Sequence, residues 1–518
     1  MTKIGAILER ARGRGWVPSL PDGRSVLGIL AAIAALFVVK IVYHRLSAGA
    51  DLAPLALLAA HIVLAAAFLS LRWDEFGGPS ALLLKGMAVV LGAYGLWGDL
   101  SFPVGESAAA DQLIATTNIA RVAQAACAVI ALWRPSFAMV PAAYVMVYKS
   151  AALDLFGVDI TFTDYLPLVD LSLFISYAFM ARRLVKVEPE TYGGYVFVAA
   201  VGAHFANYFW SARAKTAIGD SLIHWMLHNN TAWLTVAAKE VGIAPIGHWP
   251  GLLSLSVMGM MAVMPLINAM TLFGQFLAAA AIARRWSIIA ITLFYDLTHV
   301  IIFLVSGIFF WKWILLNLLI VASARKLPKL PGAALVGIAM VLLARPVFFV
   351  AKLGWYDTPA LVDSYVVAVT RDGRSYRVPS NYFGTFSVTM AQQRLARPPG
   401  HYPTVSFGAA RTRAEWKAAE NDCQIAMADR PLGAPDLVAD FLRRHHRYVL
   451  SKVDAQGHYN YDFYPHHIWS NPFMFQEFAQ LDKRTIDHYV YVVQSKCLRY
   501  DGAADVRRDD RIRIDVGN

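Results

Sequence analysis

The chain contains 518 residues, of which 57% are hydrophobic and only 16% are charged. Soluble globular proteins carry about 25% charged residues, so this composition excludes an ordinary soluble enzyme. The apolar residues occur in blocks of roughly 20, which is long enough to cross a hydrocarbon core of about 30 Å as helices. The net charge is +11, but basic residues in a polytopic membrane protein gather in cytoplasmic loops. No nucleic-acid-binding motif accompanies them, so we expect the lipid bilayer, and no nucleic acid, as a partner.

The first apolar run extends from Val26 to His44 and follows a basic segment. No small-residue cleavage site follows at the right distance, so residues 1–24 are predicted to be a cytoplasmic segment before an uncleaved helix. Ten further apolar runs predict spans at about 52–71, 80–98, 113–133, 136–156, 164–181, 193–212, 252–283, 287–306, 308–324 and 331–353. The sequence therefore predicts an all-α polytopic membrane domain with about eleven spans over residues 25–354.

A twelfth stretch, 221–238, is less apolar because it contains His224, His228, Asn229 and Asn230. We expect it to be re-entrant or interfacial. If the basic loops near Arg72, Arg134, Arg182, Arg284 and Arg325 are all cytoplasmic, the N-terminus is inside. An odd number of spans then places the C-terminus outside. The expected location is the cell (inner) membrane.

The character of the chain changes at Trp355, after which no further long apolar run occurs. Residues 355–518, roughly 160 residues, predict a separate extracytoplasmic (periplasmic) α+β domain. Alternation on both sides of Asp372-Gly373 predicts a hairpin of 364–370 with 375–378. Helical spacing at 411–422 and 435–452 predicts two helices, and 488–498 predicts another strand.

Two of the three cysteines, Cys423 and Cys497, fall in this outer domain. Disulfides persist on the oxidising side of a membrane, so a bridge between them is a testable hypothesis. The alternative is a pair of free thiols. Cys127, inside a predicted span, is interpreted as a small buried apolar residue.

The richest group of polar residues between apolar runs lies between His204 and Asn230. Ionisable groups are costly inside a membrane and are functional candidates for that reason. Lys215 lies where a helix ends, and partial desolvation there would lower its pKa toward use as a general base. The alternative is a lysine that extends to the outer interface and is held by Asp220.

Two histidine pairs add candidates to this region. His224 and His228 are four residues apart, which is the spacing of two-histidine metal sites, although no Glu follows His224 as in zinc proteases. Asp296 and His299 lie within one span, where the carboxylate would fix the tautomer of the imidazole. Each pair can equally be a structural hydrogen-bonded pair. The outer-domain histidines that we considered for metal binding are His445, His446, His458, His466 and His467; inert surface doublets are the alternative, and no metal is assigned.

The stretch Asn207-Tyr-Phe-Trp-Ser-Ala-Arg-Ala-Lys215, followed by Gly219 and His224-Trp225, resembles the vitamin K-dependent γ-carboxylase superfamily. These are the horizontally transferred transmembrane (HTTM) proteins, and the chain resembles a divergent bacterial-type member. Asp296-Leu-Thr-His299, followed by Gly307-Ile-Phe-Phe-Trp311 and Trp313-Ile-Leu-Leu-Asn317, is similar to the family's histidine-then-aromatic pair of spans. Together these motifs cover about 110 residues.

The resemblance implies a helical membrane core followed by a non-cytoplasmic domain. It also implies that Lys215 is the base in the oxidation of a reduced, vitamin K-like quinone by oxygen. The carry-over from the family stops at Lys215. As a hypothesis of our own, His224, His228, His299 and Asp296 line the catalytic cavity, and His204, Tyr208 and Trp225 hold the quinone. The family's histidine–asparagine motif has no matching position, because His228-Asn229-Asn230 follows the lysine, so glutamate carboxylation is not carried over.

Three hypotheses follow. The first is a membrane enzyme that oxidises a quinol or another lipid-soluble substrate, and it requires Lys215. The second is a metal-dependent membrane oxidoreductase built on His224 and His228 with His204 or His299. The third is a non-enzymatic maturation or partner-binding protein whose outer domain holds another protein through the aromatic run from Tyr459 to Phe475. Packing of these aromatic residues in the domain core is the alternative to the third.

Overall fold

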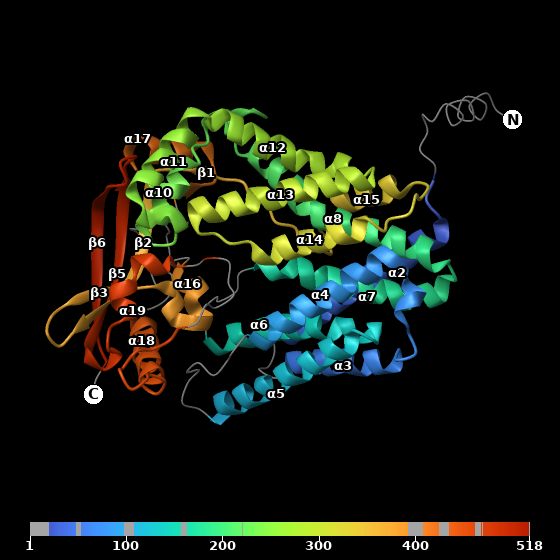
Figure 1. Cartoon of the computed structure of the whole chain (residues 1–518), viewed down its shortest axis with the longest axis horizontal. Coiled ribbons are helices and arrows are strands. Elements are labelled where there is room, and N and C mark those ends of the chain that lie inside the picture. Colours follow the sequence, from blue (N-terminus) through green and yellow to red (C-terminus); the bar gives the residue numbers. More distant parts are fainter. Residues whose placement is uncertain are drawn as a thin grey trace.

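The computed structural model describes residues 20–47, 53–97, 108–156, 163–219, 221–391, 408–423, 435–461, 468 and 470–516. The chain is mostly helical and continues into a smaller C-terminal α+β region. Most of the long helices lie side by side along the long axis of the molecule, and a β-sheet stands at one end of them (Figure 1). This arrangement confirms the expected fold class in outline.

The helical part consists of elements that follow one another without strands. Their bounds are α2 (Gly23–Ser47), α3 (Ala53–Ala67), α4 (Gly78–Trp97), α5 (Ala108–Ala131), α6 (Met139–Phe156), α7 (Leu166–Val185), α8 (Pro189–Ala217), α9 (His224–His228), α10 (Ala232–Glu240), α11 (Pro250–Ala262), α12 (Met264–Ala281), α13 (Arg285–Ser306), α14 (Trp311–Ala324) and α15 (Ala333–Leu343).

Four helices of the described residues, α2, α4, α12 and α13, are long and apolar enough to cross a membrane. Shorter apolar helices include α14 and α15. Eleven spans were expected, so the structure supports several apolar spans and leaves their full number as a prediction.

Two of the expected spans are broken, and proline accounts for both breaks. The run 252–283 forms α11 and α12, which meet at Val263, with Pro265 in the first turn of α12. The run 331–353 forms only the short helix α15, which ends before Pro346. Proline lacks a backbone N–H and clashes with the preceding turn, so neither helix continues through it. Apolar composition alone does not reveal these breaks.

The stretch 221–238 forms two short helices, α9 and α10, separated by an irregular step at Asn229 and Asn230. This stretch was expected to be re-entrant or interfacial, and its place in a membrane stays a prediction. Asn268 of α12 donates hydrogen bonds to the carbonyls of Met226 and Asn229, at 3.1 and 2.7 Å. A buried side chain therefore satisfies the backbone where α9 ends.

The C-terminal region contains an antiparallel four-stranded sheet in the order β3-β2-β5-β6. The strands are β2 (Ala360–Thr370), β3 (Ser375–Val378), β5 (Ile486–Leu498) and β6 (Ala504–Asp515), and a small second sheet pairs β1 (Tyr356–Asp357) with β4 (Ala409–Ala410). The predicted hairpin is confirmed as β2 and β3, with Gly373 at φ +81° in its turn. The predicted strand 488–498 is confirmed within β5.

The strand β6 was not predicted, because its sequence is almost entirely charged. Neighbouring charges on β6 pair with each other, as in Arg511 with Asp509 at 2.8 Å and Arg513 with Asp515 at 2.9 Å. Backbone pairing with β5 extends from His488 opposite Asp515 to Leu498 opposite Ala504. Strand formation here follows from the exposed edge of β5, and the sequence has three alternating apolar residues only at the end of the strand, Ile512, Ile514 and Val516.

The helices of this region are α16 (Ser387–Ala391), α17 (Arg413–Asp422), α18 (Pro435–Leu450) and α19 (Gln476–Ala479). The two predicted helices are confirmed as α17 and α18. Cys423, directly after α17, lies at disulfide-bonding distance from Cys497 of β5, with 5.6 Å between their Cα atoms. The expected bridge therefore ties α17 to the sheet. Cys127 is buried and free, as interpreted from the sequence.

Candidate functional site

The segment that follows α15 lies in an extended conformation against the C-terminal half of α8. We call residues 347–357 the strap. Before β1 begins at Tyr356, the backbone N–H and C=O groups of this half-buried segment have neither a helix nor a sheet to satisfy them. Here the polar side chains of neighbouring helices do so.

The first bonds to the strap come from α2 and α7. Asp170 accepts a hydrogen bond from the Phe349 N–H at 2.6 Å, and Lys40 donates to the Val347 carbonyl at 2.7 Å. The same two side chains form an ion pair at 2.6 Å. Lys40 was discounted from the sequence as a residue near a span end, but it has this structural role.

The next bonds come from one face of α8. Asn207 accepts from the Ala351 N–H at 2.8 Å, Ser211 accepts from the Leu353 N–H at 3.1 Å, and Lys215 donates to the Leu353 carbonyl at 2.6 Å. Trp225 then donates to the Trp355 carbonyl at 2.7 Å. Polar residues that mark this region in the sequence therefore hold the strap in place.

A glycine in the strap allows this close approach. A Cβ atom on Gly354 would lie 2.8 Å from the carbonyl carbon and the Cβ of Ala214 and 3.0 Å from the Lys215 nitrogen. Two of these three atoms belong to the helix backbone, which cannot move aside cheaply.

We therefore expect Gly354→Ala to destabilise the fold by about 1–3 kcal/mol, the usual cost of overpacking. The midpoint of thermal unfolding would report it. Gly259→Ala is the matched control, because a Cβ there meets nothing within 4 Å. A Gly354→Ala protein as stable as the wild type would mean that the strap is not packed against α8.

Lys215 is buried, with an exposed fraction of 7%. The desolvation that the sequence led us to expect for this lysine requires such burial. Its Nζ donates to two neutral acceptors, the Leu353 carbonyl at 2.6 Å and Gln275 Oε1 at 3.1 Å, and lies 5.3 Å from the centre of the Trp225 ring. A neutral amine has two N–H donors and one lone pair, so these two acceptors satisfy it fully. The lone pair then remains available to accept a proton.

The other buried lysines of the described residues differ in this respect. Lys312 pairs with Asp164 at 2.7 Å, and Lys496 pairs with both Asp363 and Glu240. Lys483 donates to three carbonyl oxygens, which use all three donors of an ammonium group. Lys215 alone among these four bonds to just two acceptors, both neutral, so the neutral amine is fully satisfied there without a third proton.

One carboxylate near Lys215, that of Asp357, was not predicted from the sequence. Asp357 of β1 accepts hydrogen bonds from Asn229 at 3.1 Å and Trp355 at 3.0 Å, and it lies near enough to Lys215 for each charge to affect the other. Burial raises the pKa of Asp357 to about 6, and the hydrogen bonds from Asn229 and Trp355 offset part of that rise. Asp220, the partner expected for Lys215, lies outside the described residues. We call Lys215, Trp225, Gln275 and Asp357 the lysine site.

His224 and His228 lie together beside this site, with ring centres 4.3 Å apart. His224 is hydrogen-bonded through Nδ1 to the Tyr356 hydroxyl at 2.7 Å, and both imidazoles contact the Trp416 ring of α17. The expected shared helix face is therefore observed. The disulfide matters here because it fixes the end of the helix that carries Trp416.

The remaining candidates gather in a second group around Asn317 of α14, which is fully buried. His204 Nε2 donates to Asn317 Oδ1 at 2.9 Å, while Asn317 Nδ2 donates to the Tyr208 hydroxyl at 3.2 Å and to Asp296 Oδ1 at 2.7 Å. His299 lies next to the group, 6.0 Å from the Tyr208 ring. We call these five residues the asparagine cluster.

The asparagine cluster contains unsatisfied polar atoms. Within the described part of the chain, His204 Nδ1, His299 Nδ1 and Asp296 Oδ2 are buried and have no hydrogen-bond partner. Such atoms are rare in proteins and call for an explanation, such as a bound water or ligand. Because Asn317 fixes the proton of His204 on Nε2, the free Nδ1 is an acceptor. Asp296 and His299 do not bond to each other, contrary to the structural pairing considered from the sequence.

The predicted site residues thus form two groups and not one. Lys215, Trp225, His224 and His228 lie where the helices meet the C-terminal region, whereas His204, Tyr208, Asp296 and His299 lie between α8, α13 and α14. Lys215 and Tyr208 are seven residues apart on α8, which is about 10 Å along its axis. Sequence reasoning gave no role to Gln275 or Asp357, since an isolated Gln or Asp carries no motif. Asn317 was part of a motif that resembles the HTTM family, but it was given no role of its own.

The histidines considered as metal ligands are divided between the two groups: His224 and His228 lie beside the lysine site, and His204 and His299 lie in the asparagine cluster. Within the described ranges, no set of three or more His, Cys, Asp or Glu residues is placed to hold a metal ion. His445 and His446 are buried against Tyr382 and Tyr489 and do not lie on a surface loop. His466 and His467 lie outside the described residues.

Three aromatic residues of the run considered as a binding surface pack inward, whereas Phe473 of the same run is exposed. The rings of Tyr459 and Tyr461 lie 5.6 and 5.8 Å from that of Tyr382, which is fully buried. Phe475 is buried and contacts Gly242. Residues 462–467 lie outside the described part. The core-packing alternative therefore holds for these three aromatic residues.

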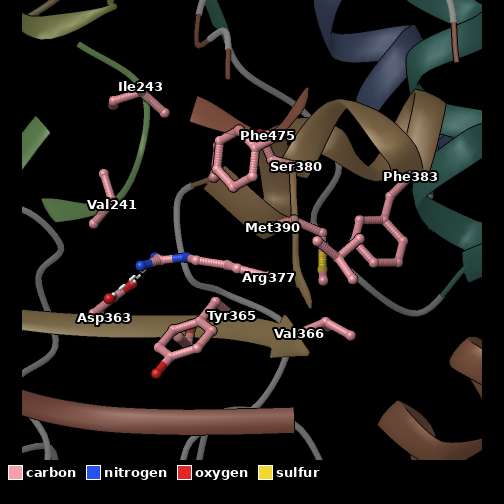
Figure 2. Close-up of a pocket in the computed structure, with 13 residues that line it drawn as sticks. Val241, Ile243, Asp363, Tyr365, Val366, Arg377, Ser380, Phe383, Met390 and Phe475 are labelled. Carbon is pink, nitrogen blue, oxygen red and sulfur yellow. Dashed lines mark hydrogen bonds and ion pairs between the residues drawn. The ribbon is translucent and has the colours of Figure 1, made fainter. Parts of the chain in front are cut away.

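A small pocket lies between the sheet and the segment after α10 (Figure 2). Its volume is about 30 Å³, which is room for a water molecule or two and not for an organic substrate. Arg377 extends toward Asp363 in its wall, at 2.9 Å (Figure 2), and Lys496 joins Asp363 to Glu240 of α10. These charges tie the sheet to the helical part.

Comparison with known proteins adds no relative. No family model matches the chain, and no curated protein and no solved structure is significantly similar to it. The geometry of the lysine site and of the asparagine cluster is therefore the ground on which a function is proposed.

Proposed function

We propose that the protein is an integral membrane enzyme that oxidises a quinol, or another lipid-soluble substrate with an acidic hydroxyl group, and that Lys215 is its base. The observation that carries this proposal is the pair of neutral acceptors around Lys215, which leaves the amine lone pair free. The resemblance to the HTTM proteins points to the same lysine, and it stays part of the proposal.

The proposed location is the cell membrane, with the N-terminus in the cytoplasm and the C-terminal region outside. Apolar side chains on the surface of the longest apolar helices support a lipid environment, for example Phe273 of α12 and Leu297 of α13, with exposed fractions of 55% and 60%. Large apolar patches on a soluble protein would cause aggregation, whereas lipid tails cover them without cost.

A reduced quinone fits the lysine site, where a neutral amine is placed to accept a proton. When bound, it supplies two electrons and two protons, which convert oxygen to hydrogen peroxide and leave the quinone. Lys215 accepts the first proton at Nζ and passes it to the reduced oxygen, which also takes the second hydroxyl proton. The asparagine cluster has no part in this step, because His204 and Lys215 are eleven residues apart on α8, about 16 Å along its axis. Burial excludes bulk water from the proton transfer.

The test is oxygen uptake by the purified full-length protein supplied with a reduced benzoquinone. Lys215→Met keeps the bulk of the side chain and removes the base, and we expect a loss of about 10²–10⁴-fold. Lys352→Met is the matched control, because Lys352 is an exposed strap residue beside the same site. We expect its rate to equal that of the wild type.

Two results would contradict the proposal. One is an unchanged rate in a folded Lys215→Met protein, which would leave Lys215 only its bond to the strap. The other is the absence of oxygen uptake by the wild type with any of several quinols. Glutamate carboxylation is not proposed.

A further inference from the structure

A polar pocket of about 450 Å³ lies where α17 meets β5 and β6 of the sheet. Both cysteines of the disulfide, Cys423 and Cys497, are half-exposed and form part of its wall. The volume is typical of a pocket for a small organic ligand. The other polar residues that line it are Trp233 of α10, Glu420 and Asn421 of α17, and Arg507 of β6.

Two opposite charges line this pocket without pairing. Glu420 and Arg507 form no ion pair with any residue that the structure describes, whereas each arginine that follows on β6 pairs with an aspartate two positions away. Arg507 lies where the register between β5 and β6 shifts and has no partner residue on β5, and such a bulge redirects a side chain. Burial raises the pKa of Glu420, a penalty that a bound cation would offset.

The indole N–H of Trp233 is a third group without a partner. Trp233 is only 5% exposed, and its Nε1 lies near the Glu420 carboxylate but has no hydrogen-bond partner within the described ranges. Buried donors of this kind are rare in proteins and call for a bound water or ligand. The Trp233 ring is held in place by stacking on Tyr500 at 3.9 Å.

These groups match the functional groups of a small zwitterion that also carries a thiol. A cation and an N–H donor, from Arg507 and Trp233, suit the carboxylate of such a ligand, and Glu420 suits its ammonium group. The sulfur of the ligand then lies in the same pocket as the disulfide. A thiol is the group that reacts with a disulfide, because its thiolate attacks one of the two sulfur atoms.

We propose that this pocket binds a small zwitterionic thiol of the amino-acid type, which opens the bridge between Cys423 and Cys497. The ligand's thiolate sulfur bonds to one Sγ atom and the Sγ–Sγ bond breaks. The second cysteine leaves as a thiolate and takes up the proton that the ligand's thiol released. The ligand is oxidised to a mixed disulfide as the bridge is reduced, so no further reactant is needed.

The exchange acts on the end of α17. Cys423 directly follows this helix, and the bridge to β5 ties it to the sheet. Opening the bridge frees the end of the helix whose Trp416 ring contacts His224 and His228. None of these steps depends on the oxidation of a quinol.

The test uses the full-length protein with free L-cysteine as the probe. Two further thiols each lack one charge: cysteamine has no carboxylate, and mercaptopropionate has no ammonium group. A maleimide caps the freed cysteine in timed samples, and peptide mass mapping gives the rate of mixed-disulfide formation at Cys423 or Cys497. Each rate is divided by the rate of the same thiol with a small soluble disulfide, which removes differences in intrinsic reactivity.

We expect L-cysteine to react about tenfold faster than either other thiol after this correction, because it alone makes both charged contacts. Arg507→Gln should slow L-cysteine by about fivefold and leave cysteamine unchanged, the effect of one ion pair near a protein surface. Glu420→Gln should slow L-cysteine and leave mercaptopropionate unchanged. Arg511→Gln, on the same strand but outside the pocket, is the matched control and should equal the wild type.

Equal corrected rates of the three thiols with the wild type would overturn the binding of a zwitterion, and so would an equal slowing of all three thiols in either pocket variant. The absence of an adduct at both cysteines would overturn the opening of the bridge, which would then be structural only. The midpoint of thermal unfolding shows whether each variant is folded. The comparison of the three thiols on the wild type needs no variant, so it decides the matter even if a variant is unstable.

Discussion

Replacing Asp164 by alanine is expected to destabilise the protein by about 3–5 kcal/mol, because it leaves a buried ammonium group without its counter-ion. Asp164 lies just before α7 and pairs with Lys312 of α14 at 2.7 Å, with both side chains only 3% exposed. Lys312 lies between the rings of Tyr94 and Trp311, at 4.6 and 4.7 Å, so the charge cannot reach water. A lower midpoint of thermal unfolding in detergent would report the loss.

The double variant Asp164→Ala/Lys312→Met provides the control for this prediction. Removing both charges is less harmful than removing one, so the double variant should be more stable than Asp164→Ala alone. Asp440→Ala, which breaks an exposed pair with Arg444 on α18, should cost less than about 1 kcal/mol. A double variant no more stable than Asp164→Ala would refute the uncompensated-charge explanation.

The C-terminal region is expected to lose stability steeply between pH 6.5 and pH 4. Burial lowers the pKa of His445 to about 3 and that of His446 to about 4. In the unfolded chain both would titrate near 6.5, so below that pH the unfolded state binds protons that the folded state does not. Each histidine then costs about 1.4 kcal/mol for each pH unit until its folded pKa is reached.

Near-ultraviolet circular dichroism of the full-length protein, recorded from pH 7 to pH 4, would follow this transition. His445→Phe should move the transition to lower pH, because phenylalanine fits among Tyr382, Phe383 and Phe441 and cannot bind a proton. His458→Gln is the control, since the side chain of His458 is 42% exposed. Equal acid transitions in wild type and His445→Phe would show that other groups control acid unfolding.

Local patterns in the sequence were sufficient for much of the C-terminal region. The turn at Asp372-Gly373 requires a positive φ at the glycine, and both flanking segments alternate, so the hairpin followed from short-range rules. The periodicity of α17 and α18 was equally clear. The strand β6 was missed because its charges pair along the strand and its pairing partner, β5, is a separate segment.

Long apolar runs predicted the class of fold, but they did not predict where each helix ends or which segments lie against one another. The run 331–353 is apolar almost throughout, yet only its first half, before Pro346, is helical. The strap is stable because Asp170, Asn207, Ser211 and Lys215, which come from two other helices, satisfy its backbone. No local pattern contains that information, since each bond joins residues more than 130 positions apart.

The sequence by itself determined the apolar helical class of the protein, the separate C-terminal α+β region and the residues whose chemistry is unusual for their surroundings. Composition and periodicity carry that information because they depend on neighbours in the chain. The tertiary structure alone decided that these residues form two groups, that Asn317 directs the hydrogen bonds of one, and that Lys215 has two neutral acceptors in the other. These hydrogen bonds depend on contacts between residues that are far apart in the sequence. Because the side chains are buried, each such contact strongly affects the protonation of the groups that make it.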